Sequence, residues 1–315
     1  MQWGENHVGQ EQKVTKRLSW FLMAAGCLLL VFLGVSHFGP AWPASAAVSF
    51  IYGNSYGSTP YVLKMNPGTV TVADSFTNLS GSNGRGVVVV SGVMYYTSAS
   101  TPNIFSYTIA THTNNGSLFS IPGVSGLSTI AFDGTNFWVG DYSGTNRAFL
   151  YSMSGTLLST IHLANCGTNC DGLEYFLQGG TTPRLISNEG DPVSPYDIYD
   201  LNGNVVSSHF ITTPWGTSAS GIAYDGTNFY VSDIFNSKLG YFNGTTGAFI
   251  SDTAVTGAPS GYPPAFEDLS ADYSITLGTP PAPTVPTLSE FGLLLCAILL
   301  LASGVILNRR RSAKA

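Results

Sequence analysis

The stretch Ile130-Ala-Phe-Asp-Gly-Thr-Asn-Phe-Trp-Val-Gly-Asp141 decides the fold, because it returns 92 residues later as Ile222-Ala-Tyr-Asp-Gly-Thr-Asn-Phe-Tyr-Val-Ser-Asp233. Nine of the twelve positions are identical. The offset is twice 46 residues, and a weaker copy that opens at Asp171-Gly-Leu-Glu174 lies between the two. Self-similarity at a fixed period of this length is typical of a repeat protein.

Each unit has the same internal order. An aromatic and β-branched run is followed by a turn such as Asp133-Gly134, then by a second run that ends near an Asp, and then by two further runs. Two earlier units begin at Val48 and Gly86. Units of about 40–50 residues with four short strands are typical of propeller blades.

We therefore predict an all-β fold, a β-propeller of about five four-stranded blades. The segment Phe266 to Tyr273 has the pattern of a first strand with no second strand after it. We expect it to return to the blade begun at Val48 and close the ring, because a closed ring leaves fewer exposed strand edges. A sixth blade is an alternative if turn-rich regions contain further strands. A β-sandwich and a β-helix are the alternative folds.

The rhythm of the two strong copies, from Ile130 and from Ile222, resembles that of NHL and gluconolactonase-like propellers. The resemblance rests on about a dozen residues in each repeat unit. It implies the propeller architecture, and for the lactonases it implies calcium-dependent hydrolysis of a lactone.

The composition restricts the class of partner. Residues 48–285 contain 15 acidic and 5 basic residues, a formal charge of −10. An acidic surface disfavours nucleic acid, because phosphate contacts require Lys and Arg. No nucleophile elbow, zinc-protease motif or phosphate-binding loop is present in the sequence. We expect no nucleic-acid partner, and the sequence favours binding over catalysis without excluding an enzyme.

The first 47 residues have the order of a secretory signal peptide. A basic start with Lys13 and Arg17 precedes an apolar helical run from Trp20 to Val35, and small residues follow at 44–47. We expect export through the Sec translocon and removal of residues 1–47. Residues 48–275 would then form the propeller outside the cytoplasm.

The C-terminal region is predicted to be a stalk followed by a membrane segment. Residues 276–287 contain four prolines, which favour an extended spacer. Residues 291–307 carry no charge over 17 positions, which is about the minimum for a membrane-spanning helix. An arginine cluster follows and would remain on the cytoplasmic side.

Residues 285–315 resemble an IPTL-CTERM sorting signal, a variant of the PEP-CTERM type. The motif residues are Val285, Pro286, Thr287, Leu288, Phe291 and Gly292, and the basic cluster is Arg309, Arg310 and Arg311. Val and Phe replace the Ile and Trp of the family pattern. The resemblance implies an exosortase-like sorting enzyme as partner. It also implies a location at the inner membrane, in the periplasm or on the surface of a Gram-negative bacterium, and a link to extracellular polysaccharide.

Cys166 and Cys170 are the cysteines outside the two targeting segments. Their spacing in an exported chain predicts one local disulfide. A metal site is the alternative, although only His162 lies near them in the sequence.

Carboxylates at strand ends are the candidate ligands for a metal. Glu174, Glu189 and Asp233 are the candidates for Ca²⁺, because strand starts and connecting loops surround a propeller's channel and Ca²⁺ prefers oxygen ligands. The repetition of Asp141 and Asp233 at matching places favours the alternative that these two residues cap turns. Trp215, in a Pro-containing loop, is the candidate for an exposed aromatic platform.

Two hypotheses of function follow from the sequence. The first is a non-enzymatic exported propeller that binds or scaffolds a polysaccharide or another surface protein. The second is a calcium-dependent, lactonase-like hydrolase that uses carboxylates at the channel mouth. A hydrolase requires one asymmetric carboxylate cluster, whereas a scaffold carries acids at equivalent positions of successive blades.

Overall fold

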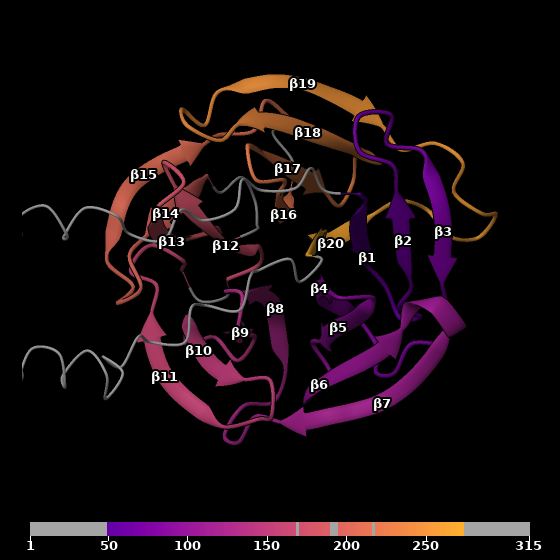
Figure 1. Cartoon of the computed structure of the whole chain (residues 1–315), viewed down its shortest axis with the longest axis horizontal. Coiled ribbons are helices and arrows are strands. Elements are labelled where there is room, and N and C mark those ends of the chain that lie inside the picture. Colours follow the sequence, from indigo (N-terminus) through magenta and orange to yellow (C-terminus); the bar gives the residue numbers. More distant parts are fainter. Residues whose placement is uncertain (1–48, 168–169, 190–194, 216–217, 274–315) are drawn as a thin grey trace, which may run out of the picture. The chain divides into compact units, whose positions relative to one another are not determined.

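The computed structural model describes residues 49–273 except 168–169, 190–194 and 216–217 (Figure 1). These residues belong to one compact unit, Ala44–Gly278. The predicted signal peptide, the stalk, the helix 291–307 and the sorting motif lie outside the described residues. Within the described residues, no helix is long and apolar enough to cross a membrane.

The described residues form one eight-stranded sheet and three four-stranded sheets, arranged in a ring (Figure 1). The eight-stranded sheet divides into two sets of four strands where β20 meets β4, so the ring has five four-stranded blades, numbered 1 to 5 from the blade that contains β1. The inner strands are β20 (Phe266–Tyr273), β4 (Gly84–Val90), β8 (Leu127–Phe132), β12 (Leu173–Gln178) and β16 (Ala219–Tyr224). The second strands are β1 (Ile51–Ser55), β5 (Val93–Ser98), β9 (Asn136–Asp141), β13 (Thr182–Ser187) and β17 (Asn228–Asp233).

The third strands are β2 (Val62–Met65), β6 (Thr101–Thr108), β10 (Arg147–Ser152), β14 (Tyr196–Tyr199) and β18 (Lys238–Asn243). The outer strands are β3 (Val72–Phe76), β7 (Thr113–Ser120), β11 (Leu157–His162), β15 (Val205–Ile211) and β19 (Phe249–Ala254). A short 3-10 turn, η1 (Ile109–Thr111), connects β6 to β7. The prediction of an all-β fold with four-stranded sheets is confirmed for the described residues, and the two predicted terminal helices lie outside them.

The ring closes as the sequence predicts. Strand β20 pairs antiparallel with β1, and Ile51 lies opposite Ala271 while Gly53 lies opposite Leu269. Blade 1 therefore combines the last described strand with the first three. At its far end β20 also pairs with β4 in parallel, through Asp272 opposite Val89, which joins blades 1 and 2.

Burial follows the radial position of each strand. Inner strands β4 and β8 are buried at every residue, including the polar residues Arg85, Ser128 and Thr129. Outer strands are exposed, and β11 and β19 contain one or no buried residue. Five apolar clusters fill the spaces between successive blades, and the cluster between blades 3 and 4 contains the buried Trp138 and Leu173. The blades thus depend on their neighbours for a core.

The repeated Asp-Gly sequence is explained by the turn that joins the first two strands of blades 3 and 5. The Asp133 carboxylate accepts hydrogen bonds from the backbone N–H groups of Thr135 (2.9 Å) and Asn136 (2.7 Å). Asp225 does the same for Thr227 and Asn228 at 2.8 and 2.7 Å. The glycine after each Asp has a positive φ, 98° and 92°, which a residue with a Cβ rarely adopts. The predicted tight turns are confirmed.

The inner strands surround the axis of the ring, which we call the channel, and we call the end at which these strands begin the mouth. Aligning them places a first layer of residues at the mouth and a second layer one residue deeper. The first layer is Arg85, Ser128, Asp171, Ser220 and Glu267. The second layer is Gly86, Thr129, Gly172, Gly221 and Asp268.

The three glycines of the second layer allow neighbouring inner strands to approach closely. A Cβ at Gly86 would lie 2.5 Å from the backbone N of Ile130, and a Cβ at Gly221 would lie 2.7 Å from the carbonyl carbon of Asp268. A Cβ at Gly172 would overlap the carbonyl oxygen of Ser220. These neighbours are backbone atoms, so a side chain here must push whole blades apart.

We expect Gly86→Ala to destabilise the protein by about 1–3 kcal/mol, the usual cost of overpacking a rigid site. The control is Gly123→Ala, since a Cβ there meets nothing within 4 Å, although its φ of 77° carries a conformational penalty. Urea unfolding followed by tryptophan fluorescence measures both variants. A loss at Gly86 no larger than that at Gly123 would contradict the close approach of blades 2 and 3.

Candidate functional site

The mouth of the channel holds one cation between two carboxylates. Arg85 of β4 donates from Nη1 to Oε2 of Glu267 at 2.7 Å and to Oδ1 of Asp171 at 3.3 Å. Its Nη2 donates to the Tyr142 hydroxyl at 2.8 Å, and the guanidinium lies 4.3 Å from the centre of the Tyr142 ring. We call these four residues, contributed by four different blades, the mouth cluster.

Burial makes the electrostatics of the mouth cluster strong. The side chains of Arg85, Asp171 and Glu267 are 9 %, 11 % and 2 % exposed. Burial raises the pKa of Glu267 to about 7, and the nearby charge of Asp171 adds to this rise, whereas Arg85 opposes it. A buried charge without a partner destabilises the folded protein, so the charge of Arg85 stabilises the two carboxylates at the mouth.

A second polar contact crosses the channel below the mouth cluster. Asp268 of β20 accepts hydrogen bonds from Thr129 Oγ1 at 2.8 Å and from the backbone N–H of Val87 at 3.3 Å. It is fully buried, and burial raises its pKa well above the ordinary range. Thr129 and Asp268 are the two second-layer residues with polar side chains, and their hydrogen bond joins β8 to β20 across the channel.

Glu174 and Tyr273 meet deeper in the channel. Glu174 of β12 is 2 % exposed, and its Oε1 accepts a hydrogen bond from the N–H of Tyr175 at 2.9 Å. Burial raises the pKa of Glu174 to about 8, while the nearby Tyr273 hydroxyl and the backbone N–H groups of Tyr175 and Tyr224 oppose that rise. Glu174 is therefore mainly protonated at neutral pH.

We expect Glu174→Gln to flatten the dependence of stability on pH. The folded-state pKa of Glu174 lies above its ordinary value of 4.5, so its stabilising effect is complete below pH 4.5 and is lost as the pH rises to about 8. Gln keeps the shape and cannot ionise. The variant should gain about 1–3 kcal/mol relative to the native protein between pH 5 and pH 8, allowing for an imperfect amide hydrogen bond.

Urea unfolding at a series of pH values measures this difference. Glu189→Gln is the matched control, because Glu189 lies in the same blade but is only half-buried. Glu267 and Asp268 also have raised pKa values, so some pH dependence should persist in the Glu174 variant. Parallel pH profiles for the native protein and Glu174→Gln would show that Glu174 does not titrate as expected.

The three predicted calcium ligands lie at different places in the fold. Glu174 is enclosed in the channel, Glu189 follows β13 at the mouth and Asp233 ends β17. Among the described residues, no three His, Cys, Asp or Glu side chains are grouped so that they would hold a metal ion. The structure therefore does not bring Glu174, Glu189 and Asp233 together.

Asp141 and Asp233 cap turns at matching places, as the alternative predicted. Asp141 Oδ1 accepts a hydrogen bond from the N–H of Ser143 at 2.8 Å, and Asp233 Oδ1 accepts one from Phe235 at 2.9 Å. Asp141 also forms a salt bridge with Arg147 at 2.6 Å. The repetition of Asp at these positions reflects the repeated turn.

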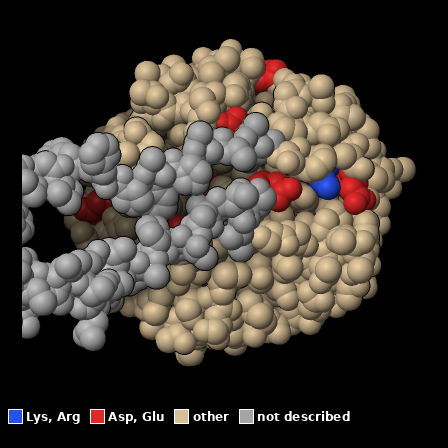
Figure 2. Space-filling model, viewed as in Figure 1, with Lys and Arg blue, Asp and Glu red and all other residues tan. Residues whose placement is uncertain are grey.

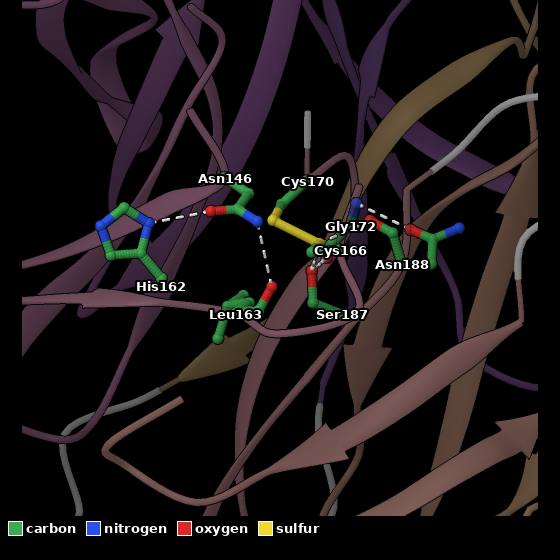
Figure 3. Close-up of a disulfide and its surroundings, with 8 residues drawn as sticks. All are labelled: Asn146, His162, Leu163, Cys166, Cys170, Gly172, Ser187 and Asn188. Carbon is green, nitrogen blue, oxygen red and sulfur yellow. Dashed lines mark hydrogen bonds between the residues drawn. A yellow bond between two sulfur atoms is a disulfide. The ribbon is translucent and has the colours of Figure 1, made fainter. Parts of the chain in front are cut away.

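A disulfide joins Cys166 and Cys170, which confirms the predicted pair (Figure 3). Both residues are buried between blades 3 and 4. The sulfur of Cys166 lies 3.2 Å from the carbonyl oxygen of Asn188, and the Asn188 side chain accepts from the N–H of Gly172 at 3.0 Å. The disulfide thus supports the segment that carries Asp171 into the mouth cluster.

Trp215, the candidate for an exposed aromatic platform, is half-buried. Its ring packs against the bare backbone of Gly240 and lies edge-on to Phe242. Its Nε1 donates to Asp252 at 2.9 Å, and Lys238 lies 5.6 Å from the ring centre. Gly240 provides the space for the indole, which the loop sequence around Trp215 does not reveal.

Arg85 and Tyr142 are the members of the mouth cluster that the sequence analysis did not select. The sequence signal for Arg85 is its position in the repeat unit. It aligns with Asp171 and Glu267, which hold the same position in their own units. Tyr142 directly follows the turn-capping Asp141, at the place of Tyr56 in blade 1. A comparison of the inner strands position by position would have identified Arg85.

Comparison with solved structures supports the fold assigned from these sheets. A chain of a nidogen–laminin complex matches with a TM-score of 0.50 and 12% identity, over 71% of this chain and 98% of that one. A glutaminyl cyclase from Myxococcus xanthus matches with a TM-score of 0.45 and 12% identity, over 55% of this chain and 71% of that one. No protein-family model and no curated protein matches the sequence. The match at a TM-score of 0.50, together with the ring of four-stranded sheets, gives the described residues a β-propeller fold.

Proposed function

We propose that this chain is an exported β-propeller that binds or scaffolds a partner at the bacterial envelope. In this proposal the Sec translocon exports it, and an exosortase-like enzyme sorts it through the IPTL-CTERM-like motif at 285–292, the helix 291–307 and Arg309 to Arg311. The observation that carries the proposal is the succession of a propeller, a proline-rich spacer and this three-part tail in one chain.

The channel supports a role in binding rather than in hydrolysis. Its buried acids are engaged by protein groups, namely Glu267 by Arg85 and Asp268 by Thr129 and Val87. Such contacts join neighbouring blades, so these carboxylates have a structural role. A surface with few charged residues is also consistent with a binding module, and Figure 2 shows that charged residues are sparse on the face it displays.

Processing of the tail tests the proposal. Deletion of residues 308–315 should leave a full-length precursor in the inner-membrane fraction, whereas the native protein should lose its tail. Cell fractionation and the mass of the purified protein measure this. The matched control replaces Lys314 by Ala, since Lys314 lies beyond the arginine cluster. If the deletion changes neither the mass nor the location of the protein, the tail is a membrane anchor and not a sorting signal.

The second candidate function is a calcium-dependent, lactonase-like hydrolase of the gluconolactonase type. It would use the carboxylates Glu174, Glu189 and Asp233, which would have to move together to hold one ion, because no three such side chains are grouped for a metal among the described residues. Hydrolysis of a lactone that is enhanced by Ca²⁺ and lost in Asp233→Asn would support it. Turnover independent of Ca²⁺, or equal in the variant, would exclude this mechanism.

A further inference from the structure

The strand that closes the ring differs from the other four inner strands in how the chain holds it. Strands β4, β8, β12 and β16 each lead through a short turn into the second strand of the same blade. Strand β20 pairs instead with β1, the first strand of the described chain, and its Leu269 lies opposite Gly53. Only noncovalent contacts therefore hold β20 to the blade that it completes.

We call residues 256–273, which contain β20, the closing arm. The N–H of Val255 still donates to the carbonyl oxygen of Ser237 in blade 5, at 3.0 Å. The N–H of the next residue, Thr256, donates to the carbonyl oxygen of Val70 in blade 1, at 3.3 Å, and its own carbonyl oxygen accepts from Val72 at 2.9 Å. The backbone thus passes from blade 5 to blade 1 between Val255 and Thr256.

This passage lies at the outer rim of the ring. Thr256 forms an isolated bridge with Thr71, which directly precedes the outer strand β3. Figure 1 shows the orange segment between β19 and β20 extending beyond β3 before it returns to the centre. Most of residues 256–263 are exposed, and Gly257 and Gly261 have positive φ values of 75° and 87°. A segment with so few buried residues opens locally at a small free-energy cost.

The surfaces that receive β20 favour its replacement once it has left. Leu269 is buried in the core between blades 5 and 1. Glu267 pairs with Arg85, and Asp268 accepts a hydrogen bond from Thr129. A ring without the arm would expose this core and leave polar channel groups without partners, which is unfavourable. The arm of a second copy satisfies the same groups, because exchange of an identical element preserves the contacts.

We propose that two copies of this chain exchange their closing arms, so that each copy closes the ring of the other. In the exchanged dimer, Glu267 of one copy pairs with Arg85 of the other, and each mouth cluster is completed by a residue of its partner. The passage at the rim allows the two rings to lie edge to edge at this point. Because the contacts of the closed ring are retained, the chain concentration sets the ratio of dimer to monomer. The inference concerns the propeller alone and is independent of the proposed sorting.

An engineered disulfide between positions 71 and 256 records which chain supplies the arm. The Oγ atoms of Thr71 and Thr256 lie 3.4 Å apart, so Thr71→Cys combined with Thr256→Cys brings two thiols within reach of a disulfide. Thr71 is half-buried and Thr256 is exposed, so these changes leave the core intact. Cys27→Ser and Cys296→Ser remove the cysteines other than the native pair.

The purified full chain in detergent is unfolded in urea, refolded at several concentrations, oxidised, and separated by gel filtration. Non-reducing electrophoresis of each fraction then shows whether the new disulfide lies within one chain or between two. We expect links between chains in the dimer fraction and links within one chain in the monomer fraction. While dimer is scarce, a tenfold higher chain concentration should raise the ratio of dimer to monomer roughly tenfold.

Ser80→Cys combined with Asn114→Cys is the matched control, because these side chains are 3.0 Å apart and both lie outside the closing arm. This control pair should form its disulfide within one chain in both fractions. The inference is overturned if the protein is monomeric at every concentration. It is also overturned if the dimer fraction of the 71/256 variant contains only links within one chain, since the dimer is then an association of two closed rings.

Discussion

A chain that ends at Ser260 is expected to lose its cooperative unfolding transition, whereas a chain that ends at Thr276 should keep it. The shorter chain lacks β20, which is the inner strand of blade 1 and the partner of β1. Phe266, Leu269 and Ala271 are at most 1 % exposed, so their loss removes apolar contacts from the core between blades 5 and 1. Burying one large apolar side chain stabilises a protein by about 1.5–3 kcal/mol.

The lost strand has two further consequences. Arg85 loses Glu267, and Thr129 loses Asp268, so polar groups inside the channel lose their partners. Strand β1 also becomes an exposed edge, which promotes association with other chains. Circular dichroism during heating and gel filtration measure both effects. Equal melting of the two truncated chains, both monomeric, would contradict the role of β20 in closing the ring.

The fold was predictable because its determinants are local and repeated. The turn at Asp133-Gly134 requires a capping carboxylate and a residue that tolerates positive φ, and both requirements appear again at Asp225-Gly226. The alternation of apolar runs and turns marks the strands of each blade without reference to distant residues. Closure was predictable as well, because Phe266 to Tyr273 lacks a following partner strand in the sequence.

The site was predictable only in part. The acids at the starts of the inner strands do line the channel, and Glu267 and Asp171 reach the mouth. Their partner was missed, since Arg85 and Glu267 are 182 residues apart and only ring closure brings them together. The burial of Trp215 depends on the missing side chain of Gly240 and on Asp252. Contacts of this kind depend on packing between elements, which local patterns do not specify.

Replacement of Arg85 by Met is expected to destabilise the protein by about 3–5 kcal/mol, the usual cost of removing one partner from a buried ion pair. Met keeps much of the side-chain length and removes the charge. Glu267 and Asp171 then lie close together with no cation between them. The hydrogen bond to the Tyr142 hydroxyl and the stacking on its ring are lost as well.

The pH at which this loss is measured should matter. Arg85 lowers the pKa of Glu267, which burial raises to about 7, so its removal should raise that pKa further. Glu267 with a raised folded-state pKa stabilises the fold fully below its ordinary value of 4.5, and this contribution is lost as the pH rises. In Arg85→Met the loss should continue above pH 7, so the difference from the native protein should be larger at pH 8 than at pH 5.

The double variant Arg85→Met with Glu267→Gln separates charge from packing. Because Gln cannot ionise, it removes one of the two carboxylates that the single variant leaves uncompensated. The double variant should therefore recover a large part of the stability at pH 8 and little at pH 5, where Glu267 is already mainly protonated. Urea unfolding of the native protein and of both variants at the two pH values gives the comparison. If the single variant loses the same stability at pH 5 and pH 8, Arg85 acts through packing and its stacking on Tyr142, and the charge balance of the mouth cluster is not what holds the inner strands together.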